Sequence, residues 1–324
     1  MTYKSKIVLF IIIILIFQII YYTCNIQLCA CKNTNFYVSY RDNVYSISDN
    51  LYKSKIINSK NCFLIFAKKM KYDLNINNGM YCLPYGTNYY KLVSILRSKD
   101  RQPIKITFSK INTHEEILEY ACKKLNMDIK IIKYYLNDLT FLNKYHSNKD
   151  NIYCIFIPNT YYINWGIDER NFIDRMYNEF NNYFSKYNEQ CELSYHNIYI
   201  LASIVSMETN DANEMTKIAG VYINRLNKKW KLQADPTIIY VLKCIDNTIK
   251  INKVFHKHLK INSPYNTYLY KGLPPGPISI PSLESINAVI LYEKHNYFFF
   301  RLKKNNNKHF FSEKYVDHYS RKYY

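Results

Sequence analysis

The chain begins with a nearly continuous apolar segment. It runs from Ile7 to Cys24, is broken by a single glutamine, and follows Lys4 and Lys6. A helix of this length just spans the hydrocarbon core of a bilayer. Because lysines favour the cytoplasmic side, we expect the short N-terminal end in the cytoplasm and the remaining chain outside. The pattern predicts a retained, single-pass anchor of the cytoplasmic (inner) membrane over residues 1–24.

Two alternatives for this segment fit less well. A cleaved signal peptide usually has a shorter apolar region and a small-x-small cleavage site, and no such site precedes Tyr21 and Tyr22. A buried core helix is disfavoured because the segment lies at the terminus.

Helical and strand patterns alternate after the anchor and predict a small mixed domain over residues 37–105, behind a polar linker at 25–36. The expected elements are helices over 47–56 and 62–70, a turn at 77–79, a strand over 80–83, and a helix carrying Tyr89, Leu92, Val93 and Leu96. This order of elements indicates a compact α+β unit.

The next segment, from 106 to 190, is mostly helical and connects to a final region over 191–324. One helix face is formed by three residues at i, i+4 and i+8, namely Phe172, Met176 and Phe180. The apolar run from Ile152 to Thr160 is instead predicted as a strand and turn, because it contains Pro158 near its end. The fold class expected for the whole chain is α+β.

Composition changes within the final region. Five of the nine prolines and two of the six glycines lie between Pro264 and Pro281. Elsewhere the chain is crowded with Lys, Asn, Ile and Tyr, a bias typical of an A+T-rich genome, which depletes Pro and Gly. A dense Pro/Gly loop against that bias predicts a shaped binding cleft, although an irregular surface connection also fits.

Charge and cysteine usage add little. The formal net charge of +19 suggests an anionic partner, but the same codon bias favours lysine, and an external location excludes nucleic acid. The nine cysteines show no paired CxxC spacing, so we expect no zinc site. Cys62 and Cys82 could pair outside the membrane, although sequence alone does not fix connectivity.

Glu208 is the candidate for acid chemistry. Ile198, Leu201 and Val205 precede it at helical spacing, so the carboxylate shares their apolar stripe. Desolvation raises the pKa of a carboxyl group and keeps it protonated near neutral pH, as a general acid requires. The alternative is a glutamate that merely ends the helix and faces solvent.

Polar residues further along have structural explanations. Glu214 suits the N-terminus of the next helix, where capping explains it. Asn224 and Arg225 lie near the end of that helix, and Arg225 could hold a carboxylate or a carbonyl. Asp235 and Pro236 fit a helix start, with Asp235 as the N-cap and Pro236 at the first helical position.

An ordered series of short motifs runs from about Tyr37 to the end of the chain. In chain order the motifs lie at 78–81, 156–161, 201–205, 208–209, 219–221, 224–226, 232–233, 235–237, 240, 263–268 and 272–278. Together they resemble the MltG (YceG-like) family of endolytic murein transglycosylases. The resemblance implies a LysM-like domain behind the anchor and a C-terminal α+β catalytic domain.

The resemblance also implies a reaction. The family's essential glutamate is the second in a Glu-x-Glu-Thr motif, which makes Glu208 the catalytic acid, with Ser206 in place of the first glutamate. The expected reaction cleaves the MurNAc-GlcNAc bond of peptidoglycan glycan strands and leaves a 1,6-anhydro end, with no cofactor. Further implications are the termination of nascent strands and coupling to peptidoglycan synthases, the penicillin-binding proteins.

The remaining site residues are expected in two groups. Those predicted to bind the glycan are Gln233, Asp235, Tyr265, Asn266, Tyr268, Gly272, Pro275 and Gly276. Those predicted to support the site are Glu214, Asn224 and Arg225. His309 and Ser312, in a hairpin expected after Phe298-Phe299-Phe300, could also face the cleft, whereas the aromatic run itself is more typical of a core strand.

Two other functions remain open. A muramidase would use Glu214 or Asp235 as a base on water and leave a reducing end instead of an anhydro end. A catalytically silent scaffold would bind the wall and recruit synthases, and the loss of a carboxylate at Ser206 is compatible with it.

Overall fold

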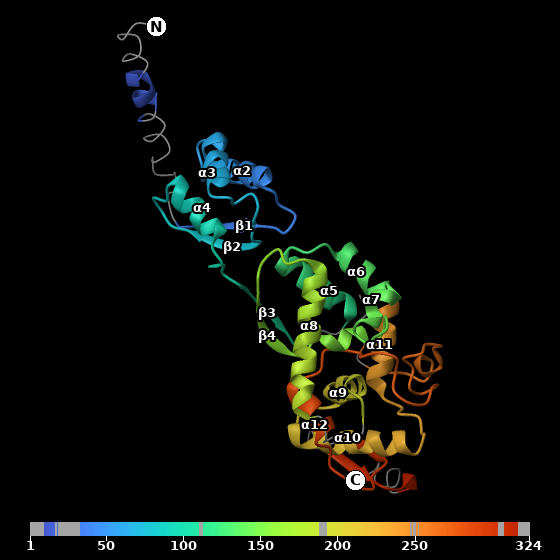
Figure 1. Cartoon of the computed structure of the whole chain (residues 1–324). Helices are drawn as coiled ribbons and strands as arrows, with labels where there is room; N and C mark the ends of the chain where they lie inside the picture. The colour runs from blue at the N-terminus through green and yellow to red at the C-terminus, as the bar shows by residue number, and fades with distance from the viewer. Residues whose placement is uncertain are drawn as a thin grey trace. The chain divides into compact units, whose positions relative to one another are not determined.

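The structure is a computed structural model that describes residues 10–16, 18, 33–109, 113–187, 193–246, 248, 251, 253–303 and 308–316 (Figure 1). Helices dominate, and the strands among these residues form three two-stranded sheets. The predicted α+β class is confirmed. The chain divides into two compact units: the first holds the described residues up to Lys105 with 123–127 and 162–168, and the second holds the remaining described residues.

The first unit has a hydrophobic core of its own. Its main elements are β1 (Thr34–Val38), α2 (Val44–Lys53), α3 (Lys60–Lys69), β2 (Gly79–Leu83) and α4 (Tyr89–Arg97). β1 and β2 pair antiparallel, and their inward residues, such as Val38 and Tyr81, join Leu51 and Leu92 in one fully buried cluster. Asparagine or serine side chains cap all three helices. The helix and the strand predicted over 80–96 are both present.

Two expectations for this unit need correction. The helix predicted over 47–56 begins earlier, at Val44, because Asn43 and Ser46 form a capping box at its N-terminus. It ends at Lys53, two residues before Lys55, which has left-handed backbone. Cys62 and Cys82, considered above as a possible disulfide, are both free thiols.

The predicted membrane anchor falls mostly on residues that the structure does not describe. Within the described ranges, no helix is both long enough and apolar enough to cross a bilayer. Most of the linker predicted at 25–36 also lies outside these ranges.

The middle of the chain is largely helical, as predicted. Its elements are β3 (Ile104–Phe108), α5 (His114–Leu125), α6 (Ile129–Asn137), α7 (Leu139–Asn143), the 3-10 helix η1 (Ile152–Ile155), β4 (Asn159–Ile163), α8 (Glu169–Phe184) and the 3-10 helix η2 (Ser185–Tyr187). β3 pairs with β4. The face of α8 predicted to be apolar is buried at all three positions.

The run from Ile152 to Thr160 was predicted as a strand from its start, and that part is wrong. Its first four residues form η1, and the strand begins only after Pro158, at Asn159. Ile152, Cys154 and Ile155 are all buried. A short, continuously buried apolar run carries no period that separates a strand from a helical turn.

The C-terminal part surrounds one buried helix. Its elements are α9 (Tyr195–Glu208), α10 (Ala212–Asn227), α11 (Asp235–Ile245), the 3-10 helix η3 (His258–Lys260), α12 (Leu283–Ile290), β5 (Phe299–Leu302) and β6 (His309–Ser312). α9 packs against α10, α11 and α12, and every residue from Ile198 to Val205 is buried. A helix buried on all sides leaves only its ends accessible, and the C-terminal end of α9 carries Glu208.

Candidate active site

Glu208 is the last residue of α9 and lines a pocket. The helix stops there because Thr209 takes an extended conformation. The pocket, called the Glu208 pocket below, is lined by Glu208, Thr209, Asn210, Asp211, Leu302, Lys308 and His309. The carboxylate is half-buried, so it is partly desolvated but still reachable. Burial raises the pKa of Glu208 to about 7, which leaves a large protonated fraction at neutral pH.

Tyr222 on α10 holds the Glu208 carboxylate in place. Its hydroxyl donates a hydrogen bond of 2.7 Å to Glu208 Oε1. Burial raises the pKa of Tyr222 well above its usual value, so the phenol keeps its proton and remains a donor. Its ring meets Phe300 of β5 edge-on, with 5.6 Å between ring centroids. Donation favours the ionised carboxylate, so Tyr222 lowers the pKa of Glu208 against the effect of burial.

A buried contact between Glu214 and His309 joins α10 to the hairpin of β5 and β6. Both oxygens of Glu214 are used: one accepts from the backbone N–H of His309 at 2.7 Å, and the other lies 2.6 Å from His309 Nδ1. The expectation that Glu214 caps its helix is wrong, because Asp211 is the N-cap. Glu214 instead fixes His309, which lines the Glu208 pocket.

Asn224 and Arg225 anchor the chain that leads into the same hairpin. The Asn224 amide donates to the carbonyls of His295 at 2.7 Å and Tyr297 at 3.0 Å. The Arg225 guanidinium donates to the carbonyl of Phe298 at 2.8 Å and to that of Leu232. Arg225 was expected to hold either a carboxylate or a carbonyl, and the structure shows that it binds carbonyls. Both residues position backbone around the site.

Asp235 and Tyr268 form a second polar pair close to Glu208. The Tyr268 hydroxyl donates to Asp235 Oδ1 at 2.6 Å. The negative charge of Asp235 further raises the pKa of Glu208. Asp235 is the first residue of α11, and Ala234 is the N-cap, so the predicted helix start was wrong by one residue. Asp235 thus keeps its carboxylate for contacts outside the helix.

Comparison with known proteins identifies the family of this chain. The model of the YceG-like family matches residues 36–323 of the chain. This chain belongs to the YceG-like family. A protein of Bacillus subtilis (strain 168) named endolytic murein transglycosylase is 28% identical over 281 residues, which cover 81% of this chain and 76% of that protein.

Other similarities are more limited. A protein of the same name from Streptococcus pneumoniae serotype 2 (strain D39 / NCTC 7466) is 29% identical over 164 residues, or 50% of this chain and only 30% of that protein. The 2.6 Å crystal structure of a YceG-like protein from Listeria monocytogenes covers 90% of this chain and all of that one, with a TM-score of 0.57. At 24% identity this likeness supports the fold alone.

Several residues predicted to bind glycan in this YceG-like chain instead make contacts within the protein. Asn266 is fully buried, and its amide donates to the carbonyls of Leu259 and Ile261 while its oxygen accepts from Tyr268 N. Tyr265 packs on Tyr240, with 4.8 Å between ring centroids. The structure therefore gives Asn266 a role inside the loop and removes it from the glycan-binding set.

The Pro/Gly loop also has a structural role. Gly276 is buried, and an added Cβ there would lie 2.2 Å from the carbonyl oxygen of Asp150, so close packing explains this glycine. Gly272 needs its left-handed backbone (φ 87°) and faces open space. Pro275 lines a pocket with His196 and Leu226, not the pocket of Glu208.

Two further expectations differ in outcome. Gln233 is exposed and has left-handed backbone (φ 51°), and its backbone N–H donates to the carbonyl of Thr267 at 3.1 Å. Ser312 is buried within the hairpin and does not line the Glu208 pocket, so the suggestion that it faces the cleft is wrong.

Sequence reasoning missed Tyr222, the residue in direct contact with Glu208. It was assigned only to the apolar stripe of its helix, because its spacing fits that stripe. A buried tyrosine hydroxyl normally finds a hydrogen-bond partner, and this property was the signal available.

Proposed function

We propose that this chain is an endolytic murein transglycosylase with Glu208 as its catalytic acid. One observation carries the proposal: a reachable carboxyl group whose pKa is raised to about 7, which is held by Tyr222 and lines a pocket. A general acid works best when its pKa is near the working pH. The names of the relatives from Bacillus subtilis and Streptococcus pneumoniae support the same activity.

The proposed reaction uses Glu208 twice. The protonated carboxyl donates its proton to the oxygen that joins MurNAc to GlcNAc, and the bond from C1 to that oxygen breaks with its electron pair on the oxygen. The substrate's own acetamido group stabilises the positive charge at C1. The carboxylate then accepts the proton of the C6 hydroxyl, whose oxygen bonds to C1 and closes the 1,6-anhydro ring. Neither water nor a cofactor is consumed, and Glu208 ends protonated, as it began.

The surroundings of the other carboxylates favour this reaction over hydrolysis. A muramidase usually needs a second carboxylate as nucleophile or as base on a water. Glu214 is unsuited, because both of its oxygens bind His309. Asp235 accepts a hydrogen bond from Tyr268 and remains the candidate base if hydrolysis occurs. We assign Asp235, Tyr268 and the exposed Gln233 to glycan contacts.

Membrane attachment, wall binding and partner recruitment complete the proposal. The apolar segment over residues 7–24 would anchor the chain with its catalytic part on the outer (periplasmic) side. The first unit, with two helices between the paired strands β1 and β2, is the proposed LysM-like domain that binds peptidoglycan. Coupling to a penicillin-binding protein, proposed from the family resemblance, would place the activity on nascent strands.

The decisive experiment compares the wild-type chain with Glu208→Gln on purified peptidoglycan. Mass spectrometry of the soluble fragments should find 1,6-anhydro ends with the wild type and none with the variant, while circular dichroism shows the same fold. Reducing ends would support the muramidase instead. A folded wild-type chain that releases no fragments would support the silent scaffold.

A further inference from the structure

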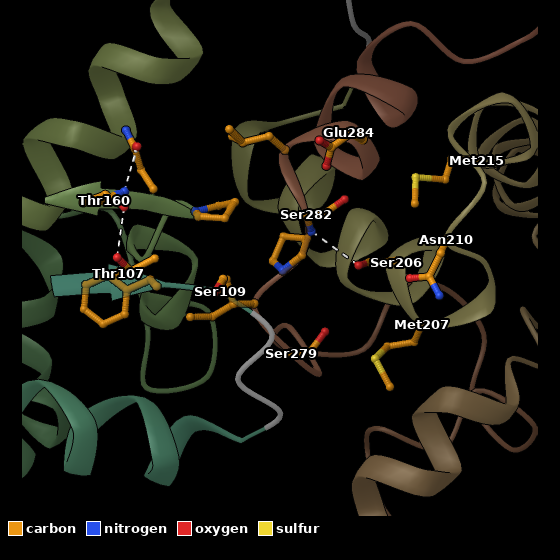
Figure 2. Close-up of a pocket in the computed structure, with 16 residues that line it drawn as sticks. Thr107, Ser109, Thr160, Ser206, Met207, Asn210, Met215, Ser279, Ser282 and Glu284 are labelled. Carbon is orange, nitrogen blue, oxygen red and sulfur yellow. Dashed lines mark hydrogen bonds between the residues drawn. The ribbon is translucent and has the colours of Figure 1, made fainter.

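A second pocket opens on the other side of the C-terminal turn of α9. Its walls come from the ends of β3 and β4, the last turn of α9 and the segment 279–284 that leads into α12, and its volume is about 560 Å³. Ser206 and Met207 line it, so it is called the Ser206 pocket. In Figure 2, Thr107 and Thr160 lie at one side of this pocket and Met207, Asn210 and Met215 at the other.

The Ser206 pocket and the Glu208 pocket are neighbours. Asn210 lines both of them. Ser206 and Glu208 are two residues apart at the end of one helix, so their side chains point to different sides of its last turn. A molecule bound across this helix end, with its reacting bond at Glu208, would therefore reach past Asn210 into the Ser206 pocket.

The Ser206 pocket combines accessible apolar side chains with hydroxyl groups that are already hydrogen-bonded, and this combination suits a peptide better than a sugar. Apolar side chains are accessible there, and Met207 and Leu283 expose 41% and 37% of their surface. Most hydroxyls are already engaged: Thr107 bonds Thr160 at 2.9 Å, and Ser206 accepts from the backbone N–H of Ser282 at 3.3 Å. A sugar ring needs many polar partners, whereas small aliphatic side chains and methionine pack together readily.

Glu284 brings a negative charge to the Ser206 pocket. It is the sole ionisable side chain among the described residues that line the pocket, and its side chain is exposed. It forms none of the salt bridges found in the described part of the chain. Its position in the first turn of α12 also favours a carboxylate there, because it complements the helix dipole. In a chain of net charge +19, an unpaired carboxylate in a pocket favours a cationic occupant.

We propose that the Ser206 pocket receives the peptide branch of the muramyl residue next to the cleaved bond, and that Glu284 pairs with a free ammonium group on that branch. This inference rests on the proposed function, and it makes Glu284 a residue that determines specificity. Murein carries such branches on its glycan strand, so a strand seated at Glu208 brings one to the adjoining pocket. The enzyme would then distinguish peptide-bearing strands from bare glycan.

Binding tests the inference without any need for cleavage. The full chain in detergent carries Glu208→Gln, and fluorescence anisotropy measures its binding to end-labelled glycan strands. The strands bear peptides with a free side-chain amine, the same peptides after N-acetylation, or no peptides. Adding Glu284→Gln should weaken binding to the amine-bearing strands about two- to fivefold, the effect of one partly exposed ion pair. It should not change binding to the acetylated or bare strands.

Glu116→Gln is the matched control, because Glu116 also lies in the first turn of a helix, α5, and does not line the Ser206 pocket. It should leave all three affinities unchanged. The inference would be overturned if adding Glu284→Gln left the affinity for amine-bearing strands the same as that of the parent Glu208→Gln chain. It would also be overturned if the affinity for bare strands fell as much as that for amine-bearing strands. Failure of the proposed function has a different signature: the wild-type chain would cut none of the strands, whatever their binding pattern.

Discussion

Burial and the hydrogen bond from Tyr222 act in opposite directions on the ionisation of Glu208. Burial raises the pKa of Glu208, and the hydrogen bond from Tyr222 opposes part of that rise. The proposed acid must be protonated before it acts, so cleavage should fall as the pH rises through about 7. The rate of release of anhydro-ended fragments between pH 5 and pH 9 measures this alkaline limb. A rate that stays constant up to pH 9 would argue against Glu208 as the acid.

Replacing Tyr222 with Phe should shift the pH at which the cleavage rate falls, the alkaline limb of the pH profile. Without the hydroxyl, the ionised carboxylate loses a donor, so the pKa of Glu208 rises and the loss of activity shifts to higher pH. The maximal rate should also fall, because the carboxyl group is no longer held in one orientation. The pH profile of the Tyr222→Phe chain tests both effects, and a purely structural role of Tyr222 would lower the rate without moving the limb.

The same ionisation links folding stability to pH. The pKa of Glu208 in the fold, about 7, lies above its ordinary value of 4.5, so the folded state binds this proton more tightly than the unfolded state. The contribution to stability is complete below about pH 4.5 and is lost as the pH rises through about 7. Glu208→Gln removes this loss, and it should stabilise the chain at pH 8 by up to about 3 kcal/mol.

Chemical denaturation of both proteins at pH 4 and pH 8 measures that difference. The two should be almost equally stable at pH 4, where Glu208 is protonated in both states. If the difference between variant and wild type is the same at both pH values, the carboxyl group is not desolvated as described.

At the scale of elements, α10 organises the site. It carries Tyr222 to Glu208 and binds the segment before β5 and the hairpin through Asn224, Arg225 and Glu214. Gly220 on the same helix allows a close approach: an added Cβ would lie 2.4 Å from the carbonyl oxygen of Glu293 and 2.7 Å from His295 Nε2. Backbone cannot retreat as a flexible side chain can, so this position requires glycine.

Gly220→Ala should therefore destabilise the chain although alanine favours helices. Overpacking of this kind costs about 1–3 kcal/mol, which exceeds the gain of about 1 kcal/mol in helix propensity. Thermal unfolding should show a lower Tm, and activity should fall because the displaced segment leads into β5. Asn227→Ala, at an exposed position of the same helix, is the control and should change neither. A Gly220→Ala chain as stable as the wild type would contradict the close approach.

At the scale of the whole molecule, the two units contain separate cores. The buried cluster of the first unit includes no residue of the second unit. The core of the second unit is built around the buried helix α9. Separate cores are compatible with the proposed division of roles, in which the first unit binds wall polymer and the second cleaves it. The proposed anchor would hold both at the membrane surface.

The anchor is tested by cell fractionation. The full chain should sediment with membranes and resist extraction by high salt, whereas a chain that starts at Asn33, just before β1, should be soluble, because it lacks the apolar segment. Protease added outside intact spheroplasts should digest the catalytic part. Recovery of the full chain in the soluble fraction would refute the anchor.

Much of the fold was predictable because its signals are local. The stripe from Tyr89 to Leu96, the apolar face of α8 and the strand β2 follow from residue patterns alone. The turn predicted at 77–79 is wrong, because Gly79 already begins β2. The run from Ile152 to Ile155 was not, since a fully buried segment shows no period. Its conformation depends on neighbours that are distant in the sequence.

The sequence by itself determined the α+β class, the family, and Glu208 as the carboxyl group on an apolar helix stripe. The tertiary structure decided the rest: Tyr222 rather than a second carboxylate touches Glu208, Glu214 binds His309, and Asn266 is buried inside its own loop. The physical reason is the range of the interactions. Helix periods and caps act over a few residues, whereas desolvation and side-chain hydrogen bonds join residues that only the fold brings together.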